Sequence, residues 1–136
     1  MRVLCAALAA ATIVLVACTA ARADPSTVNF ELYAQNRPGK TGTVMIEQVP
    51  SGVKIVILMA DGQNGRQPIH IHTGTCANPS LVPSYTLTDI MNGSSTTTIL
   101  DVTLDALLKG NYVVDVHESS ADAARYVACA AIAAAK

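Results

Sequence analysis

Apolar and polar residues alternate with a period of two through most of this chain. Val28, Phe30 and Leu32 are separated by residues that suit an outer face, and the same spacing or a β-branched run recurs downstream. These later runs lie at residues 44–46, 53–59, 69–72, 85–87, 100–104 and 112–116. Because successive side chains of a β-strand point to opposite faces, the pattern predicts half-buried strands.

Turn-forming residues separate these runs at short intervals. They are Arg37-Pro38-Gly39, Pro50-Ser51-Gly52, Asp61-Gly62 with Asn64-Gly65, Asn92-Gly93 and Lys109-Gly110-Asn111. Asn92-Gly93 suits a tight type I′ hairpin. Seven or eight short strands with regular turns predict one all-β domain, a sandwich or barrel, over residues 24–136.

The segment 121–136 is ambiguous. It is rich in alanine, the best helix former, and local propensity favours a helix. A final strand through Tyr126–Cys129 would bring Cys129 to Cys76 more naturally. We therefore expect a strand and keep the helix as the alternative.

The N-terminus reads as a targeting signal. Met1-Arg2 precedes fifteen apolar residues, Val3–Ala17, and Ala21-Arg22-Ala23 forms an A-x-A cleavage site, so residues 1–23 are expected to be a secretory signal peptide. The apolar run is shorter than the roughly 20 residues of a membrane span. Leu15–Cys18 also resembles a bacterial lipobox, which would make residues 1–17 the signal and Cys18 the lipidated N-terminus. Both alternatives place the protein in the cell envelope, periplasmic or secreted.

Charge and composition exclude several function classes. The net charge is −1, with 9 Lys+Arg against 10 Asp+Glu, so there is no basic field for nucleic acid. The chain has no Trp and one Phe, too few for base stacking. No P-loop, dinucleotide-binding motif or catalytic triad is present.

Two cysteines remain after signal removal. Cys5 is lost in both processing schemes, and Cys18 is either lost or lipidated. Cys76 and Cys129 form an even pair in an oxidising compartment, so we expect a disulfide. Closing this loop of about fifty residues is worth about 4 kcal/mol in the chain-entropy model.

All three histidines lie on two predicted strands. His70 and His72 are two residues apart and project from one face, while Ile69 and Ile71 point to the core. By the same parity His117 also points away from the core. The three imidazoles are thus expected on the outer face of the barrel, within reach of solvent.

Histidines in this arrangement predict a metal site, although an H-x-H pair is often only two surface imidazoles. Three imidazoles suit copper or zinc, and Cu²⁺ binds nitrogen ligands more tightly than Zn²⁺. Asp115 shares the face of His117 and is a candidate to orient it, or else a solvated strand residue.

Three segments together resemble the Cu/Zn superoxide dismutases. The segment Gln67–Cys76 (QPIHIHTGTC) looks like the family's H-x-H-x-x-G stretch with its disulfide Cys downstream. Val116-His117-Glu118 resembles the family's late V-H-E, and Ala124–Cys129 resembles its closing R-x-A-C. The similarity in order covers most of residues 27–132. A looser likeness to chordin-type domains lacks the Cys pair. The family implies a Greek-key barrel with copper held by His70, His72 and His117 on its outer face.

The departures from that family are also specific. Residues 77–84 contain no bridging histidine and no zinc ligands, so no zinc site is expected. The loop after Val116-His117-Glu118 is short. The family's active-site Arg lies three residues before the last Cys, whereas Arg125, the candidate for anion steering, lies four before Cys129.

Three functions stay open on the sequence. The first is a copper-binding protein of the cell envelope, acting as a buffer, carrier or sensor. The second is a copper-only superoxide dismutase, with superoxide drawn by Arg125. The third is a metal-free structural or interaction domain, which the apolar outer stripe Val56 and Leu58 supports weakly, as a dimer contact or a surface covered by a loop.

Overall fold

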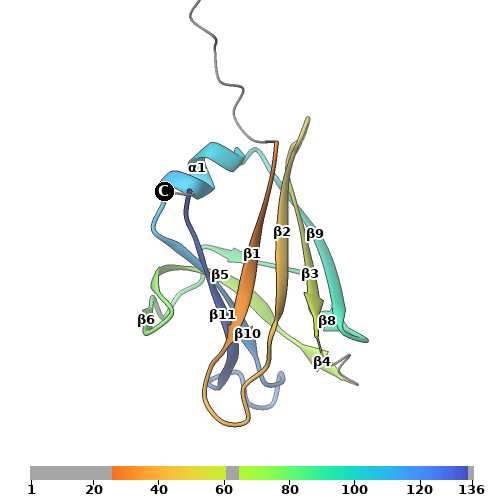
Figure 1. Cartoon of the computed structure of the whole chain (residues 1–136), viewed down its shortest axis with the longest axis vertical. Helices are drawn as coiled ribbons and strands as arrows, with labels where there is room; N and C mark the ends of the chain where they lie inside the picture. The colour runs from red at the N-terminus through yellow and green to blue at the C-terminus, as the bar shows by residue number, and fades with distance from the viewer. Residues whose placement is uncertain (1–25, 61–64, 135–136) are drawn as a thin grey trace, which may run out of the picture.

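The computed structural model describes residues 26–60 and 65–134. The predicted signal segment, Cys18 and most of the turn at residues 61–65 lie outside this range. Within it the chain is mostly β, as predicted, and forms one curled antiparallel sheet with the shape of a half-barrel (Figure 1). No helix in this part of the chain is long and apolar enough to span a membrane.

Seven strands of six or more residues form the body of the sheet. They are β1 (Thr27–Ala34), β2 (Gly42–Val49), β3 (Gly52–Met59), β5 (Ile69–Thr75), β9 (Ser94–Leu100), β10 (Tyr112–His117) and β11 (Tyr126–Ile132). Four two-residue strands raise the count within the described residues above the seven or eight expected: β4 (Arg66–Gln67), β6 (Asn78–Pro79), β7 (Tyr85–Thr86) and β8 (Ile90–Met91). A strand of two residues is too short to show period-two alternation in the sequence.

The strand order is β4-β8-β9-β3-β2-β1-β11-β10-β5-β6, with β7 paired to β5. β1 joins the two halves of the sheet, because its first six residues pair with β2 whereas Tyr33 and Ala34 pair with β11. Long connections place β9 beside β3 and β10 beside β5, which is Greek-key connectivity. The site strands β5 and β10 are therefore assembled by non-local pairing.

The hydrophobic core lies on the concave side that the curled sheet encloses. Alternation along the strands supplies it: Val44 and Ile46 of β2 and Ile55 and Ile57 of β3 are 0–1% exposed. On the outer face of β3, Leu58 is 53% exposed and Val56 is half-buried. The stripe expected from the sequence thus exists, without a partner in a single chain.

The turn chemistry is confirmed at Asn92-Gly93. Both residues have positive φ, 52° and 81°, as the two central positions of a type I′ turn require, and Met91 pairs with Ser94 across the hairpin.

The expected strand over Leu100–Leu104 is wrong. β9 ends at Leu100, Asp101 takes φ 57°, and Thr103 caps a short helix α1 (Leu104–Lys109) by accepting a hydrogen bond from Ala106 N. Leu104 and Leu107 of this helix are buried. The alternation of Leu100, Val102 and Leu104 runs from the end of β9 through residues 101–103 into the first residue of α1, so it does not belong to one strand.

The alanine-rich C-terminal segment forms a strand, β11, over Tyr126–Ile132. Cys129 of this strand bonds to Cys76, confirming the disulfide, and the two cysteines are 53 positions apart in the sequence. Local helix propensity is overridden here because pairing with both β10 and β1 satisfies the backbone and buries the small side chains.

Candidate metal centre

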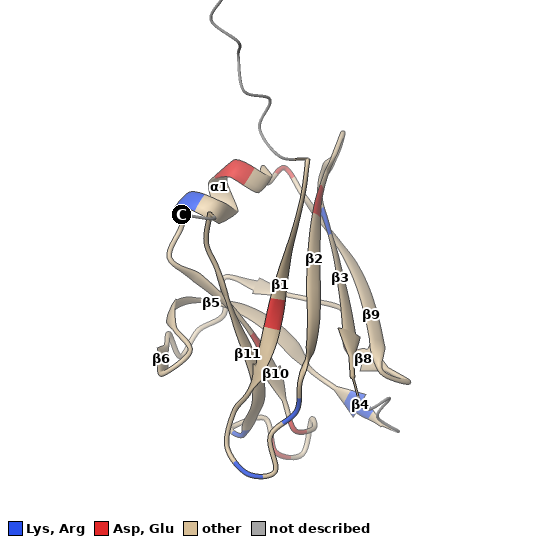
Figure 2. Cartoon of the chain, viewed as in Figure 1, with Lys and Arg blue, Asp and Glu red and all other residues tan. Residues whose placement is uncertain are grey.

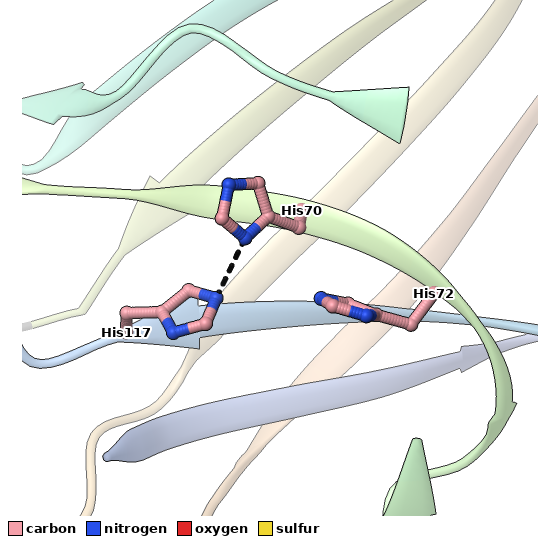
Figure 3. A group of neighbouring side chains, drawn as sticks. All are labelled: His70, His72 and His117. Carbon is pink, nitrogen blue, oxygen red and sulfur yellow. Dashed lines mark hydrogen bonds between the residues drawn. The ribbon is translucent and has the colours of Figure 1, made fainter. Parts of the chain in front are cut away.

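The three histidines come from the neighbouring strands β5 and β10. Asp115 of β10 lies opposite His70 of β5, and Val113 lies opposite His72. Since Ile69, Ile71, Val114 and Val116 face the core and are 0% exposed, the intervening residues of both strands share the other face. The parity predicted for His70, His72 and His117 is therefore confirmed (Figure 3).

The imidazole rings converge on a common point (Figure 3). One ring nitrogen of each histidine lies within 4.8 Å of the corresponding nitrogens of the other two. His70 Nδ1 is 2.8 Å from His117 Nε2, and the ring centroids of His70 and His72 are 5.6 Å apart. Three nitrogens at this spacing form a group that can hold a metal ion.

Backbone carbonyls fix the tautomers of two of the histidines. His72 Nδ1 lies 2.7 Å from the carbonyl oxygen of Ser80, and His117 Nδ1 bonds to that of Ala123. A carbonyl oxygen only accepts, so each Nδ1 must carry the hydrogen. In the neutral ring, Nε2 of both histidines then carries the lone pair that a metal ligand requires, and Nε2 of His117 also lies 2.8 Å from His70 Nδ1.

The site is more enclosed than the sequence suggested. His72 is 2% exposed and His117 3%, whereas His70 is half-buried. The expectation of a solvent-reached outer face is wrong for His72 and His117. The segment after β6 that contains Ser80 and the β10–β11 loop that contains Ala123 both fold over the imidazoles.

Burial also decides the charge state of the histidines. Desolvation lowers the pKa of His70, and the neighbouring rings of His117 and His72 lower it further. Desolvation likewise lowers the pKa of His117, against a smaller raising effect of its bond to Ala123. The lowered pKa values favour the neutral rings, which are the form that binds a metal ion.

The disulfide holds one of the covering segments in place. Cys76 lies just after β5, and Cys129 lies in β11 opposite Asp115. Four residues after Cys76, Ser80 donates its backbone N–H to Thr73 O and offers its carbonyl to His72. The disulfide therefore ties the segment that contains Ser80, whose carbonyl orients His72, to the body of the sheet.

Asp115 is neither a solvated strand residue nor the hydrogen-bond partner of His117, whose Nδ1 bonds to Ala123 instead. Its side chain is 1% exposed, and its Oδ2 has no hydrogen-bond partner. Desolvation raises the pKa of Asp115 to about 7. A buried carboxyl thus lies on the histidine face of the sheet.

Tyr126 joins this face through an irregularity that the sequence did not reveal. Val116 pairs with Ala128 but His117 pairs with Tyr126, so β11 contains one extra residue at this point. The bulge turns Val127 into the core, where it is 0% exposed, and brings Tyr126 opposite His117. The Tyr126 ring centroid lies 4.8 Å from that of His117 and 6.2 Å from that of His72.

Arg125 is not grouped with the histidines. Its guanidinium donates to the carbonyl of Arg37, and its Nε lies 3.8 Å from Glu118 Oε2. These contacts hold the side chain over the β1–β2 and β10–β11 connections. The charged residues of this end of the molecule lie in the same loops (Figure 2).

Comparison with protein-family models, with curated proteins and with solved structures gives no match for this chain. The fold class is an antiparallel β half-barrel, and the site is a group of three histidines that can hold a metal ion.

Proposed function

We propose that this chain is an extracytoplasmic copper-binding protein, related to the Cu/Zn superoxide dismutases, which holds one ion through His70, His72 and His117. We assign as ligand atoms Nδ1 of His70 and Nε2 of His72 and His117. One ring nitrogen of each histidine lies within 4.8 Å of those of the other two, and His70 Nδ1 is 2.8 Å from His117 Nε2. The expected signal peptide or lipobox supports a location in the cell envelope.

One observation carries the proposal. His72 Nε2 is buried and has no hydrogen-bond partner within the described residues. A buried polar atom without a partner costs free energy, so native structures rarely keep one without a reason. The orphaned lone pair points into the group of His70 and His117 (Figure 3), where an ion would satisfy it.

The donor set favours copper among the available metals. All three ligands are neutral imidazoles, and the order of affinities at nitrogen sites places Cu²⁺ above Zn²⁺. The bonds of His72 to Ser80 and of His117 to Ala123 are the outer contacts that orient metal-bound histidines. Copper would supply one-electron chemistry or be carried as cargo.

Binding is tested by adding one equivalent of Cu²⁺ to the purified, disulfide-intact protein and recording its electron paramagnetic resonance spectrum. We expect an axial signal with coupling to about three nitrogens. His70→Gln and His117→Gln should weaken binding by orders of magnitude, whereas Met91→Ala should not. Met91 is the matched control, because it carries an exposed thioether, a type of group that binds copper, on β8 and not on the histidine strands. A free-copper signal from the parent protein would refute the proposal.

The same sample separates a copper carrier from a superoxide dismutase. An evolved enzyme should consume superoxide much faster than a small copper–imidazole complex does. If Arg125 steers the anion, Arg125→Gln should lower that rate and reduce its dependence on ionic strength. A superoxide consumption rate equal to that of the small complex would exclude an evolved enzyme and favour a carrier, buffer or sensor.

A further inference from the structure

Asp115 is a buried carboxyl beside the three histidines, and an inference about its role rests on the metal binding proposed for them. In the antiparallel ladder Asp115 lies directly opposite His70 on one side and Cys129 on the other. Residues directly opposite one another have Cβ atoms about 5 Å apart. Asp115 also shares its strand face with His117, two residues away. The Asp115 carboxyl therefore lies on the same face of the sheet as the three imidazoles.

Nothing among the described residues explains why a carboxyl is buried there. Asp115 is 1% exposed, its Oδ2 has no hydrogen-bond partner, and no Lys, Arg or His nitrogen of the described chain forms an ion pair with it. Leaving a buried charge uncompensated is strongly unfavourable. Its neighbour Val113 shows that this face of β10 also accepts an aliphatic side chain.

The other carboxylates near the histidines already have cations beside them. Asp89, which acts electrostatically on His70, is paired with Arg66. Glu118 lies beside Arg125, with Arg125 Nε 3.8 Å from its Oε2. The groups that face Asp115 are the neutral imidazole of His70, the Cys129 sulfur of the disulfide and the phenol of Tyr126.

We propose that Asp115 is the counter-charge of the metal centre and makes the site prefer a divalent ion over a monovalent one. Three imidazoles bring no negative charge, so a bound dication would otherwise stay uncompensated in a buried pocket. The group of mutually close ligand atoms contains only the histidines, and we therefore assign Asp115 a compensating role and not that of a fourth ligand. The attraction of a carboxylate for an ion scales with the ion's charge, so its removal must cost a dication more.

The test compares Zn²⁺ with Ag⁺, two redox-stable ions that differ in charge. Their affinities are measured by competition with a chelator of known affinity, in the same buffer and at the same pH for every variant. The variants are Asp115→Asn, Asp115→Val and Asp105→Asn. Asp105 is the matched control, because it removes one exposed carboxylate on α1, away from the histidine strands.

We expect both Asp115 variants to weaken Zn²⁺ binding by about tenfold or more relative to Ag⁺ binding. Asp105→Asn should leave the ratio unchanged. Equal effects on the two ions would overturn the counter-charge role and leave the three-histidine site standing. A parent protein that binds neither Zn²⁺, Ag⁺ nor Cu²⁺ would refute the proposed function itself.

Asp115→Val guards against a folding artefact. If the amide of Asp115→Asn disturbs the buried site, the aliphatic variant still gives a well-packed side chain without charge. Far-ultraviolet circular dichroism and a thermal melt establish that each variant is folded before its metal affinities are compared.

Discussion

His70 Nδ1 lies 2.8 Å from His117 Nε2, although 47 residues separate the two histidines in the chain. Because His117 Nδ1 donates to the carbonyl of Ala123, its Nε2 is the acceptor, and the hydrogen of this pair belongs to His70 Nδ1. The metal-free site is thus closed by a hydrogen bond between two of its own ligands. An ion must replace that hydrogen.

The tautomers of the histidines are the first prediction. In the metal-free protein His72 and His117 should carry hydrogen on Nδ1, and His70 should carry it on Nδ1 as well. On adding Zn²⁺, the hydrogen of His70 should move to Nε2, because Nδ1 becomes the ligand. Long-range ¹H–¹⁵N correlation spectra of the ring nitrogens measure this directly. Hydrogen on Nε2 of His72 before metal addition would contradict the assignment.

The disulfide is expected to act on both stability and metal binding. The double variant Cys76→Ala/Cys129→Ala should lose about 4 kcal/mol of unfolding free energy, from the 53-residue separation of the two positions. It should also bind Cu²⁺ about 10- to 100-fold more weakly, because Ser80 no longer holds His72 as firmly. The double variant is needed since a single free thiol would itself bind copper. Urea denaturation measures the unfolding free energy, and chelator competition measures the copper affinity. An unchanged copper affinity would show that the disulfide does not influence the metal site.

The buried carboxyl of Asp115 should give the metal-free protein an unusual pH dependence. Its pKa is about 7 in the folded chain against 3.8 as the ordinary value, so between these pH values the folded state holds a proton that the unfolded state has lost. The unfolding free energy therefore falls as pH rises through this window, by up to about 4 kcal/mol, and the loss is complete above it.

Asp115→Val isolates this contribution. His70 and His117 have lowered pKa values, so their contribution to stability rises with pH below 6.5, the ordinary histidine value, but parent and variant share it. Urea denaturation at about pH 5 and about pH 8 should show the variant gaining stability relative to the parent at the higher pH. A pH-independent difference would show that Asp115 titrates normally.

Tyr126 is expected to stabilise the closed site by packing against His117 and His72. Tyr126→Ala should cost about 2 kcal/mol of unfolding free energy, below the range for a fully buried aromatic ring because Tyr126 is only half-buried. Tyr126→Phe should keep most of that stability. Tyr33→Ala is the control, since Tyr33 is 63% exposed and a surface truncation usually changes stability by less than about 0.5 kcal/mol. Equal losses at Tyr126 and Tyr33 would refute the packing role.

The fold class, the strand face of the histidines and the disulfide could all be predicted from residue types and their spacing. Period-two alternation depends only on the geometry of a strand, so the parity of His70, His72 and His117 followed without knowledge of which strands pair. The Asn92-Gly93 turn followed for a similar reason, because few residues adopt positive φ at two successive positions.

The closure of the site and its surroundings depend on contacts between segments that are far apart in the sequence. The carbonyls of Ser80 and Ala123 reach the imidazoles because loops fold back over β5 and β10, and backbone groups leave no trace in residue type. The bulge that aims Tyr126 at His117 arises from the register between β10 and β11, which local alternation does not fix. The burial of Asp115 has the same origin: its strand face is polar by parity, but the segments packed over that face exclude water from it.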